Sequence, residues 1–106
     1  MADILICGAN EGIGYHMALA LLDLGHRVDV LDLSLDNIGP LQRKFEGRLL
    51  CYEGDVRSES SVAQAVCAAA GAFGGLDAAV QNACLCPFSP FEDTDSGVLK
   101  AAFYVN

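Results

Sequence analysis

Apolar residues in this chain occur in short runs separated by longer amphipathic segments, a pattern typical of alternating strands and helices. Residues 2–7 form a compact apolar run that predicts a buried parallel strand. From Ile13 onward, apolar residues recur at intervals of four, four and three, at Met17, Leu21 and Leu24. This spacing predicts a helix that packs one apolar stripe on a sheet, with Gly25 as its left-handed cap.

The same alternation continues along the chain. Apolar runs at residues 26–33, 48–54 and 76–80 predict three further strands. Turn and cap residues after the second strand introduce a short helix that ends at Gly47. The apolar side of this helix is formed by Ile38, Leu41 and Phe45.

Two more helices are expected in the second half of the chain. Ser58 is a natural N-cap for the first of these helices, and the glycines at 71, 74 and 75 end it. Its buried stripe is formed by Val62, Ala65, Val66, Ala69 and Ala70. A loop at residues 86–95 follows the fourth strand. Thr94 or Asp95 then caps a final helix that runs to about Tyr104.

Four β-α units in this order predict an α/β fold of the Rossmann type. We expect a three-layer sandwich in which a parallel sheet of four strands, in the order 3-2-1-4, carries helices on both faces. Residues 1–106 form a single domain in this prediction.

A glycine-rich segment joins the first strand to the first helix, with the sequence C-G-A-N-E-G-I-G from Cys7 to Gly14. Gly8 allows a tight exit from the strand, Gly12 lets the backbone approach a pyrophosphate, and Gly14 brings helix and strand close together. The free N–H groups of the first helical turn then face an anion. The segment predicts a dinucleotide phosphate loop; the alternative is a glycine-rich turn without a ligand.

The second predicted strand ends in an acidic residue, Asp32, eighteen residues after Gly14. At this spacing a carboxylate accepts hydrogen bonds from the adenosine ribose hydroxyls of a dinucleotide. The same carboxylate repels a 2′-phosphate, which predicts NAD rather than NADP. A solvated aspartate at a strand end is the alternative. Asp29, earlier in the strand, is expected at the surface.

Composition excludes several classes of function. The chain is 53% hydrophobic with a formal net charge of −8, and its six Lys and Arg residues are scattered, so neither a nucleic acid nor an anionic membrane surface is expected as a partner. No apolar run approaches the roughly 20 residues of a membrane span, and Asp3 replaces the basic start of a signal peptide. We therefore expect a cytoplasmic protein.

The five cysteines do not form a metal-binding pattern. Cys7 and Cys51 lie in predicted strands and Cys67 on an alanine-rich helix face, where a free thiol acts as a small apolar group. Cys84 and Cys86 supply two ligands where a structural zinc site needs four. No metal site is predicted, and a redox role for Cys84 or Cys86 stays open.

The spacing G-x-x-x-G-x-G within C-G-A-N-E-G-I-G resembles the T-G-x-x-x-G-I-G motif of the short-chain dehydrogenase/reductase family, with Cys7 in place of threonine. Gly54-Asp55-Val56 is similar to the D-V element that holds the adenine ring in this family, although a simple strand-end turn is the alternative. G-G-L-D-A-A-V-Q-N-A at residues 74–83 resembles the family's G-x-L-D-x-L-V-N-N-A-G; Asn82 and Ala83 match, whereas Gln81 and Cys84 depart. The last two residues, Val105 and Asn106, resemble a V-N pair of the family. This resemblance implies that Asn106 corresponds to the family's structural and proton-relay asparagine.

The resemblance implies NAD as cofactor and Asn106 as a member of an incomplete catalytic set. The cofactor-binding residues that it implies, together with the loop and strand-end residues above, are Gly8, Asn10, Gly12, Ile13, Gly14, Asp32, Leu33, Asp55, Val56, Asn82 and Ala83. The family's catalytic Tyr-x-x-x-Lys pair does not occur in the chain, nor is the catalytic serine matched. Two interpretations remain open: the N-terminal part of a family oxidoreductase, and a stand-alone dinucleotide-binding or self-assembling module without turnover.

The final predicted helix is apolar over a broad arc, and the fourth predicted strand has no fifth strand beside it. Unpaired strand edges and large apolar patches favour association. The sequence therefore predicts a homodimer built on strand four and the helix at residues 98–105.

Overall fold

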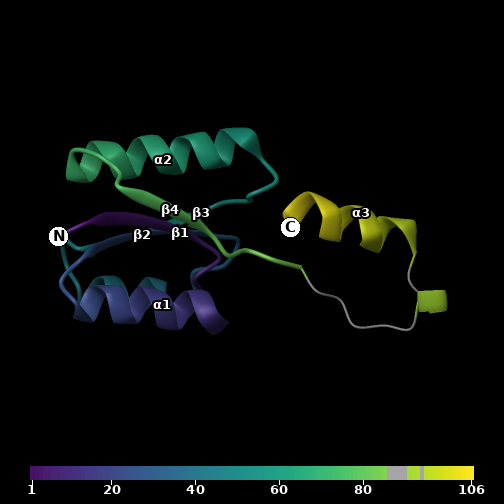
Figure 1. Cartoon of the computed structure of the whole chain (residues 1–106), viewed down its shortest axis with the longest axis horizontal. Coiled ribbons are helices and arrows are strands. Elements are labelled where there is room, and N and C mark those ends of the chain that lie inside the picture. Colours follow the sequence, from purple (N-terminus) through teal and green to yellow (C-terminus); the bar gives the residue numbers. More distant parts are fainter. Residues whose placement is uncertain (86–90, 94) are drawn as a thin grey trace.

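A computed structural model of the whole chain, described here for residues 1–85, 91–93 and 95–106, contains a parallel sheet of four strands (Figure 1). The strands lie in the order β3-β2-β1-β4. Their bounds are β1 (Asp3–Cys7), β2 (Arg27–Asp32), β3 (Leu49–Glu53) and β4 (Ala78–Gln81). The predicted fold class and strand order are confirmed.

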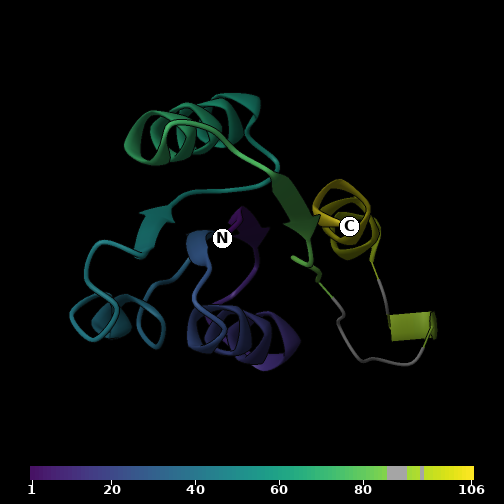
Figure 2. The ribbon, with the colours of Figure 1, turned by 60° about the vertical axis from the view of Figure 1, so that its left-hand side comes forward.

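Helices cover both faces of this sheet (Figures 1 and 2). One face carries α1 (Gly12–Asp23) and the 3-10 turn η1 (Gly39–Gln42), and the opposite face carries α2 (Glu59–Phe73). A second 3-10 turn, η2 (Phe91–Asp93), and α3 (Ser96–Val105) follow β4. The first three strands and their helices thus form the predicted three-layer arrangement.

The strand β1 is the centre of the sheet, and its alternating side chains feed both halves of the core. Ile6 packs with Val28 and Val30 against α1, whereas Leu5 and its neighbours on the other face pack against Ala65 of α2. Because both faces of a doubly covered parallel sheet are buried, such strands are apolar throughout rather than alternating. This explains the continuous apolar run from Ile4 to Cys7.

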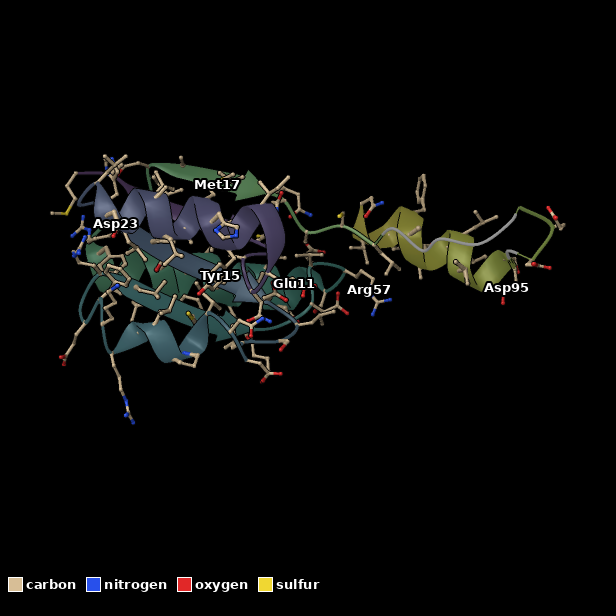
Figure 3. All side chains as sticks on the ribbon, turned by 90° about the horizontal axis from the view of Figure 1, so that it is seen from below. Glu11, Tyr15, Met17, Asp23, Arg57 and Asp95 are labelled. Carbon is tan, nitrogen blue, oxygen red and sulfur yellow. The ribbon has the colours of Figure 1, made fainter. Side chains whose placement is uncertain are left out.

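The buried face of α1 differs from the predicted stripe. Ile13 and Leu24 are each 74% exposed, while the buried residues are Gly14, Ala18 and Leu22. Gly14 and Ala18 are small and let the helix lie close to the sheet. The row that faces the sheet is therefore shifted by one residue toward the C-terminus from the predicted row. Figure 3 views the molecule from the α1 side, with Glu11 and Asp23 marking the ends of the helix.

Two helix boundaries also differ from the prediction. The helix α2 continues through Gly71 and ends at Phe73, where Gly74 is the left-handed cap with φ of +79°. The segment around residues 38–45 contains only the single turn η1, although Ile38 and Phe45 are buried as expected. Gly71 is tolerated in α2 because glycine weakens a helix without forbidding it.

Asp29 was expected at the surface, and this prediction is wrong. Its side chain is 0% exposed, and Asp3 in the neighbouring strand is 1% exposed. The sequence pattern treated the acidic residue as the solvent-facing position of a strand, but both faces of β2 are covered.

The helix α3 lies beyond the carboxyl ends of the strands, away from the layers (Figures 1 and 2). It has no buried residue, so it is not one of the helices that cover the sheet. Asp95 caps it, because its Oδ1 accepts from the N–H of Val98 at 2.8 Å. The predictions for Cys86 and for Thr94 as a cap lie outside the described residues. Among the described helices, none is both long and apolar enough to cross a membrane.

Candidate functional site

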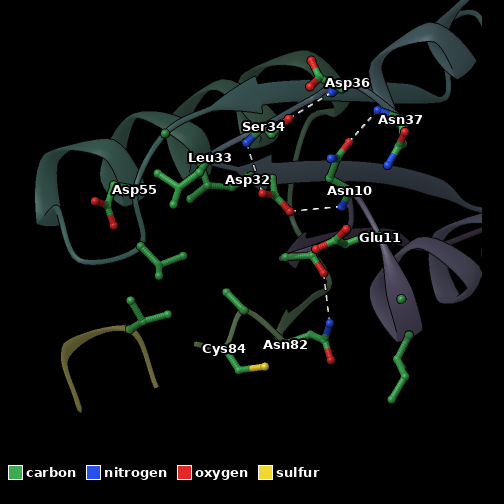
Figure 4. Close-up of a pocket in the computed structure, with 18 residues that line it drawn as sticks. Asn10, Glu11, Asp32, Leu33, Ser34, Asp36, Asn37, Asp55, Asn82 and Cys84 are labelled. Atoms are coloured by element: carbon green, nitrogen blue, oxygen red, sulfur yellow. Dashed lines mark hydrogen bonds between the residues drawn. The ribbon is translucent and has the colours of Figure 1, made fainter. Parts of the chain in front are cut away.

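A cleft of about 660 Å³ opens at the carboxyl ends of the strands (Figure 4). Its walls come from the glycine loop after β1, the end of β2 with the loop that follows, the segment after β3, the end of β4 and the last turn of α3. Side chains that follow parallel strands meet at this edge, which is where ligands bind in open α/β sheets.

The glycine loop is built so closely that two of its positions admit only glycine. Gly8 has a φ of +88°, and a Cβ on it would lie 2.6 Å from the Cα of Ala83. A Cβ on Gly14 would collide with the carbonyl oxygen of Gly8 and approach the Nδ2 of Asn82 to 2.8 Å. The start of α1 is therefore pressed against the ends of both β1 and β4.

Gly12 is open where the other two are crowded. It has a φ of +65°, which disfavours any side chain, and apart from its chain neighbours and the backbone of its own helix no atom of the described residues lies within 4 Å of where its Cβ would be. Glu11, at the N-cap of α1, makes no side-chain cap hydrogen bond. The first N–H groups of α1 thus have no side-chain acceptor from the cap and lie beside open space, an arrangement that suits a phosphate group.

Asp32 at the end of β2 is joined to the glycine loop by a hydrogen bond. Its Oδ2 accepts from the N–H of Asn10 at 3.0 Å and its Oδ1 accepts from the N–H of Ser34 at 3.2 Å, as the dashed lines in Figure 4 show. The side chain is half-buried and lines the cleft. Each carboxylate oxygen keeps a further lone pair for a ligand hydroxyl.

The side chain of Asn10 connects the glycine loop to the loop after β2. Its side chain is buried, and its Oδ1 accepts from the N–H of Asn37 at 2.8 Å and from that of Ile38 at 3.1 Å. These bonds hold the loop after β2 against the glycine loop. Asn10 lines the cleft, but its amide oxygen is already satisfied within the protein.

The end of β4 forms the opposite wall. The Nδ2 of Asn82 donates to the carbonyl oxygen of Gly8 at 2.9 Å, and the N–H of Asn82 donates to the carbonyl of Cys7 at 3.0 Å. Ala83 packs directly on Gly8. These contacts fix the distance between β4 and the glycine loop, and so the width of the cleft.

Asp55 and Val56, after β3, also line the cleft. Arg57 holds the Asp55 carboxylate in a two-pronged ion pair, with Nη2 2.7 Å from Oδ2 and Nε 3.1 Å from Oδ1. Hydrogen bonds from Arg57 hold the pKa of Asp55 below its usual value. Asp55 is therefore ionised at neutral pH.

The cleft lining is acidic. Four carboxylates and no lysine or arginine occur among its described residues, the acids being Glu11, Asp32, Asp36 and Asp55. Glu11 and Asp36 were not among the predicted site residues. The signal that could have found them was their position, Glu11 directly before Gly12 and Asp36 in the loop directly after Asp32.

Two cysteines lie near the cleft in different environments. Cys7 is buried at the end of β1 and does not line the cleft, and burial together with the charge of Asp32 raises the pKa of its thiol. Cys84 is exposed on the cleft wall. Within the part of the chain that the structure describes, no group of three or more His, Cys, Asp or Glu residues could hold a metal ion.

The structure gathers most of the predicted cofactor-binding residues around the cleft. Those that line it are Gly8, Asn10, Gly12, Ile13, Asp32, Leu33, Asp55, Val56, Asn82 and Ala83. Gly14 lies behind the loop and acts through packing. Asn106 does not reach the cleft; its Oδ1 accepts from the N–H of Leu85 at 2.7 Å and its Nδ2 donates to the Leu85 carbonyl at 3.1 Å.

The sheet order, the glycine loop between β1 and α1 and the cleft at the strand ends define the Rossmann class of α/β proteins. Comparison with known families narrows the class. Residues 2–106 match the family described as short chain dehydrogenase, and the chain belongs to this family.

Relatives with assigned names are longer enzymes. A probable 2,4-dienoyl-CoA reductase of Bacillus subtilis (strain 168) is 33% identical over an alignment of 90 positions that covers 79% of this chain and 35% of that protein. An L-rhamnose 1-dehydrogenase (NAD(P)(+)) of Sphingomonas sp. (strain SKA58) is 31% identical over an alignment of 109 positions that covers 97% of this chain and 42% of the relative. The chain thus spans less than half the length of these relatives.

Solved structures agree with the fold. A 3-ketoacyl-(acyl-carrier-protein) reductase from Brucella melitensis complexed with NADH superimposes with a TM-score of 0.89 and 26% identity, covering 98% of this chain and 43% of that one. A short-chain dehydrogenase/reductase, glucose/ribitol dehydrogenase, from the same organism gives a TM-score of 0.90 at 22% identity, over 98% and 45% of the two chains. The family binds nicotinamide dinucleotides.

Proposed function

We propose that this chain binds the adenosine and pyrophosphate parts of NAD(H) in the cleft. The observation that carries the proposal is the open space beside Gly12, next to the uncapped first turn of α1. A pyrophosphate there receives main-chain N–H groups and the positive end of the helix dipole. The adenosine ribose then lies toward Asp32 and the adenine toward Asp55 and Val56, which line the same cleft.

The acidic lining supports NAD(H) over NADP(H) in this proposal. A 2′-phosphate carries close to two negative charges and would lie beside Asp32, with Glu11 and Asp36 also on the cleft wall. No described cation of the lining offsets them, and Arg57 is committed to Asp55. Two ribose hydroxyls, in contrast, supply donors for the remaining lone pairs of the Asp32 carboxylate.

Isothermal titration calorimetry with NAD(H), NADP(H) and AMP tests this assignment. We expect NAD(H) and AMP to bind, NAD(H) to bind more tightly than NADP(H), and Asp32→Ala to narrow the difference. Asp23→Ala is the matched control, because it removes the same charge from the exposed far end of α1. Equal affinity of the unmutated chain for both dinucleotides would defeat the role given to Asp32.

The reaction of the family, hydride transfer between a nicotinamide and an alcohol or carbonyl, is proposed here for a longer protein of which this chain forms the cofactor-binding part. The alternative is a stand-alone module that binds dinucleotide without turnover. Codons after Asn106 in the encoding gene separate the two. A serine and a Tyr-x-x-x-Lys sequence there favour the enzyme, and an immediate stop codon favours the module.

We further propose that the 106-residue chain forms a homodimer through β4 and α3. Among the described residues no strand pairs with the outer edge of β4, and Leu99 and Phe103 of α3 are 55% and 82% exposed. An apolar patch of about 400 Å² at roughly 25 cal/mol per Å² contributes on the order of 10 kcal/mol before the entropy of association is subtracted. A two-fold axis beside β4 lets one such surface cover its copy.

Light scattering at micromolar concentration tests the dimer. We expect twice the monomer mass of 11.1 kDa, and the monomer mass for Phe103→Asp. Ile13→Asp is a matched control, since Ile13 is another exposed apolar residue that lies outside β4 and α3. A monomer mass for the unmutated chain would overturn this proposal without affecting the cofactor assignment.

A further inference from the structure

Two aspartates lie side by side in the interior, away from the cleft. Asp3 begins β1, and Asp29 lies in the middle of β2, where Asp3 is paired with Arg27 and Leu5 with Asp29. Alternation along parallel strands places Asp3, Arg27 and Asp29 on one face of the sheet, the face that α2 covers. Because Leu5, the partner of Asp29, lies two positions after Asp3 on the same face of β1, the two carboxyl groups are diagonal neighbours across the strand pair.

Neither side chain finds another partner. All four carboxyl oxygens of Asp3 and Asp29 are buried, and within the described residues none accepts a hydrogen bond from another group. Burying one unpaired carboxylate is already unfavourable by several kcal/mol, and a second negative charge beside it adds repulsion. A proton held between the two groups removes one charge and supplies the missing donor.

The surrounding groups can offset only one negative charge. From β2, Arg27 faces the pair, and its Nε is also buried without a hydrogen-bond partner. From β3, Tyr52 lies on the same face of the sheet, and it is neutral because burial and the nearby aspartates raise the pKa of its hydroxyl group. Before β4, Asp77 accepts from the N–H of Asp3 at 2.7 Å and adds a further negative charge nearby.

The helix above the pair supplies no cation. The titratable side chains of α2 are Glu59, at the opposite end of the helix, and Cys67, which is exposed. Its last residue, Phe73, packs under the Arg27 guanidinium, which lies 4.8 Å from the centre of the ring. Burial, the hydrogen bond with Asp3 and the charge of Asp3 raise the pKa of Asp29 to about 8, and Arg27 opposes this shift.

We propose that Asp3 and Asp29 share one proton in the folded protein at neutral pH, and that loss of this proton in mildly alkaline solution loosens the packing of the last turn of α2 on the sheet. With one proton bound, the trio of Asp3, Asp29 and Arg27 carries no net charge. When the proton is lost, the second buried carboxylate attracts the Arg27 guanidinium away from Phe73, or water enters the space beneath α2. The pair is thus a pH-sensitive clasp between β1, β2 and α2, independent of any ligand in the cleft.

The sign of the effect follows from linkage. The pKa of Asp29 is raised by folding, so the folded state holds a proton that the unfolded chain has released between about pH 4 and pH 8. The stabilisation is complete below pH 4 and is lost as the pH rises to about 8. In that window one proton changes the unfolding equilibrium constant by roughly tenfold per pH unit.

Denaturant unfolding of the 106-residue chain from pH 5 to pH 9 tests the clasp. We expect the equilibrium constant for unfolding of the unmutated chain to rise with pH up to about 8, by close to tenfold per pH unit from this proton. Asp29→Asn should remove that tenfold contribution, because an amide donates a hydrogen bond to Asp3 at every pH. Asp23→Asn, at an exposed position, keeps the slope. An Asp29→Asn chain with the full slope overturns the proposal.

A second measurement keeps the test decisive if Asp29→Asn does not fold. Infrared spectroscopy of the unmutated chain at pH 6.5 should show the carbonyl stretch of a protonated carboxylic acid, which disappears as the pH passes about 8 while the hydrogen exchange of the last turn of α2 accelerates. A spectrum containing only ionised carboxylates at pH 6.5 would refute the shared proton.

Discussion

The main-chain N–H of Asn10 donates to the Oδ2 of Asp32 over 3.0 Å, which ties the glycine loop to the end of β2. The side chain of the same asparagine reaches the loop beyond β2, through the N–H groups of Asn37 and Ile38. The proposed phosphate-binding and ribose-binding parts of the cleft are therefore held together by one residue.

Asn10→Ala should weaken both stability and nucleotide binding. It leaves the N–H groups of Asn37 and Ile38 without their acceptor, which lowers the free energy of unfolding by about 1–3 kcal/mol, and it loosens the loop that carries Asp36. Denaturant unfolding and AMP titration measure the two effects. Asn10→Asp keeps the acceptor oxygen and should retain most of the stability; if it loses as much as Asn10→Ala, the bridge is not the cause.

Gly8→Ala should destabilise the fold more than alanine at a glycine of similar backbone conformation. Gly8 and Gly25 have φ of +88° and +93°, but only at Gly8 would the new methyl group meet the backbone of Ala83. We expect a loss of about 1 kcal/mol for Gly25→Ala from backbone strain alone, and about 3 kcal/mol or more for Gly8→Ala. Equal losses would show that β4 moves aside at no cost.

The cysteines should react with a thiol reagent at very different rates in the native protein. Cys67 and Cys84 are exposed, whereas Cys7 is buried and Cys51 has a pKa of about 12. At pH 8 a thiol of pKa 12 contains about a thousandfold less thiolate than one of ordinary pKa, and burial slows it further. Mass spectrometry of peptides after brief alkylation checks the order. Early labelling of Cys51 would contradict it.

We expect the 106-residue chain to show no steady-state dehydrogenase activity on alcohols or carbonyls. Tyr15 and Tyr52 are not followed by a lysine four residues later, and loss of a positioned proton donor alone reduces such a reaction by roughly a hundred- to ten-thousandfold. Nicotinamide absorbance with a panel of substrates measures it. Turnover that persists after purification controls and disappears in Gly12→Val, whose side chain would occupy the open space of the cleft, would prove this expectation wrong.

The arrangement of the cleft could be predicted from sequence because its signals are local. The glycine spacing from Gly8 to Gly14, Asp32 at a strand end and Asn82 after another strand each lie next to an element boundary, and parallel strands bring such boundaries to one edge. The bridging role of Asn10 could not be predicted in this way, since its partners Asn37 and Ile38 lie in a loop whose path depends on the whole fold.

The missed features depend on packing that spacing alone does not determine. The predicted stripe of α1 follows the spacing of Ile13, Met17, Leu21 and Leu24, whereas the structure buries the row formed by Gly14, Ala18 and Leu22. Asp29 was assigned to solvent because a charged residue is seldom buried. Its neighbour Asp3 lies far away in the sequence, so local spacing could not reveal that the two aspartates are buried together.

The central position of β1 determines the order in which the sheet can assemble. Asp3 pairs with Arg27, but Ile4 on the other edge pairs with Ala78, about three times as far along the chain. Because closing a longer loop loses more chain entropy, β1, β2 and β3 can associate while one edge of β1 still waits for β4. Until β4 has paired, the apolar strand β1 keeps one unpaired edge. The rate at which residues 76–81 pair with this edge therefore competes with pairing of the edge to another copy of the folding chain.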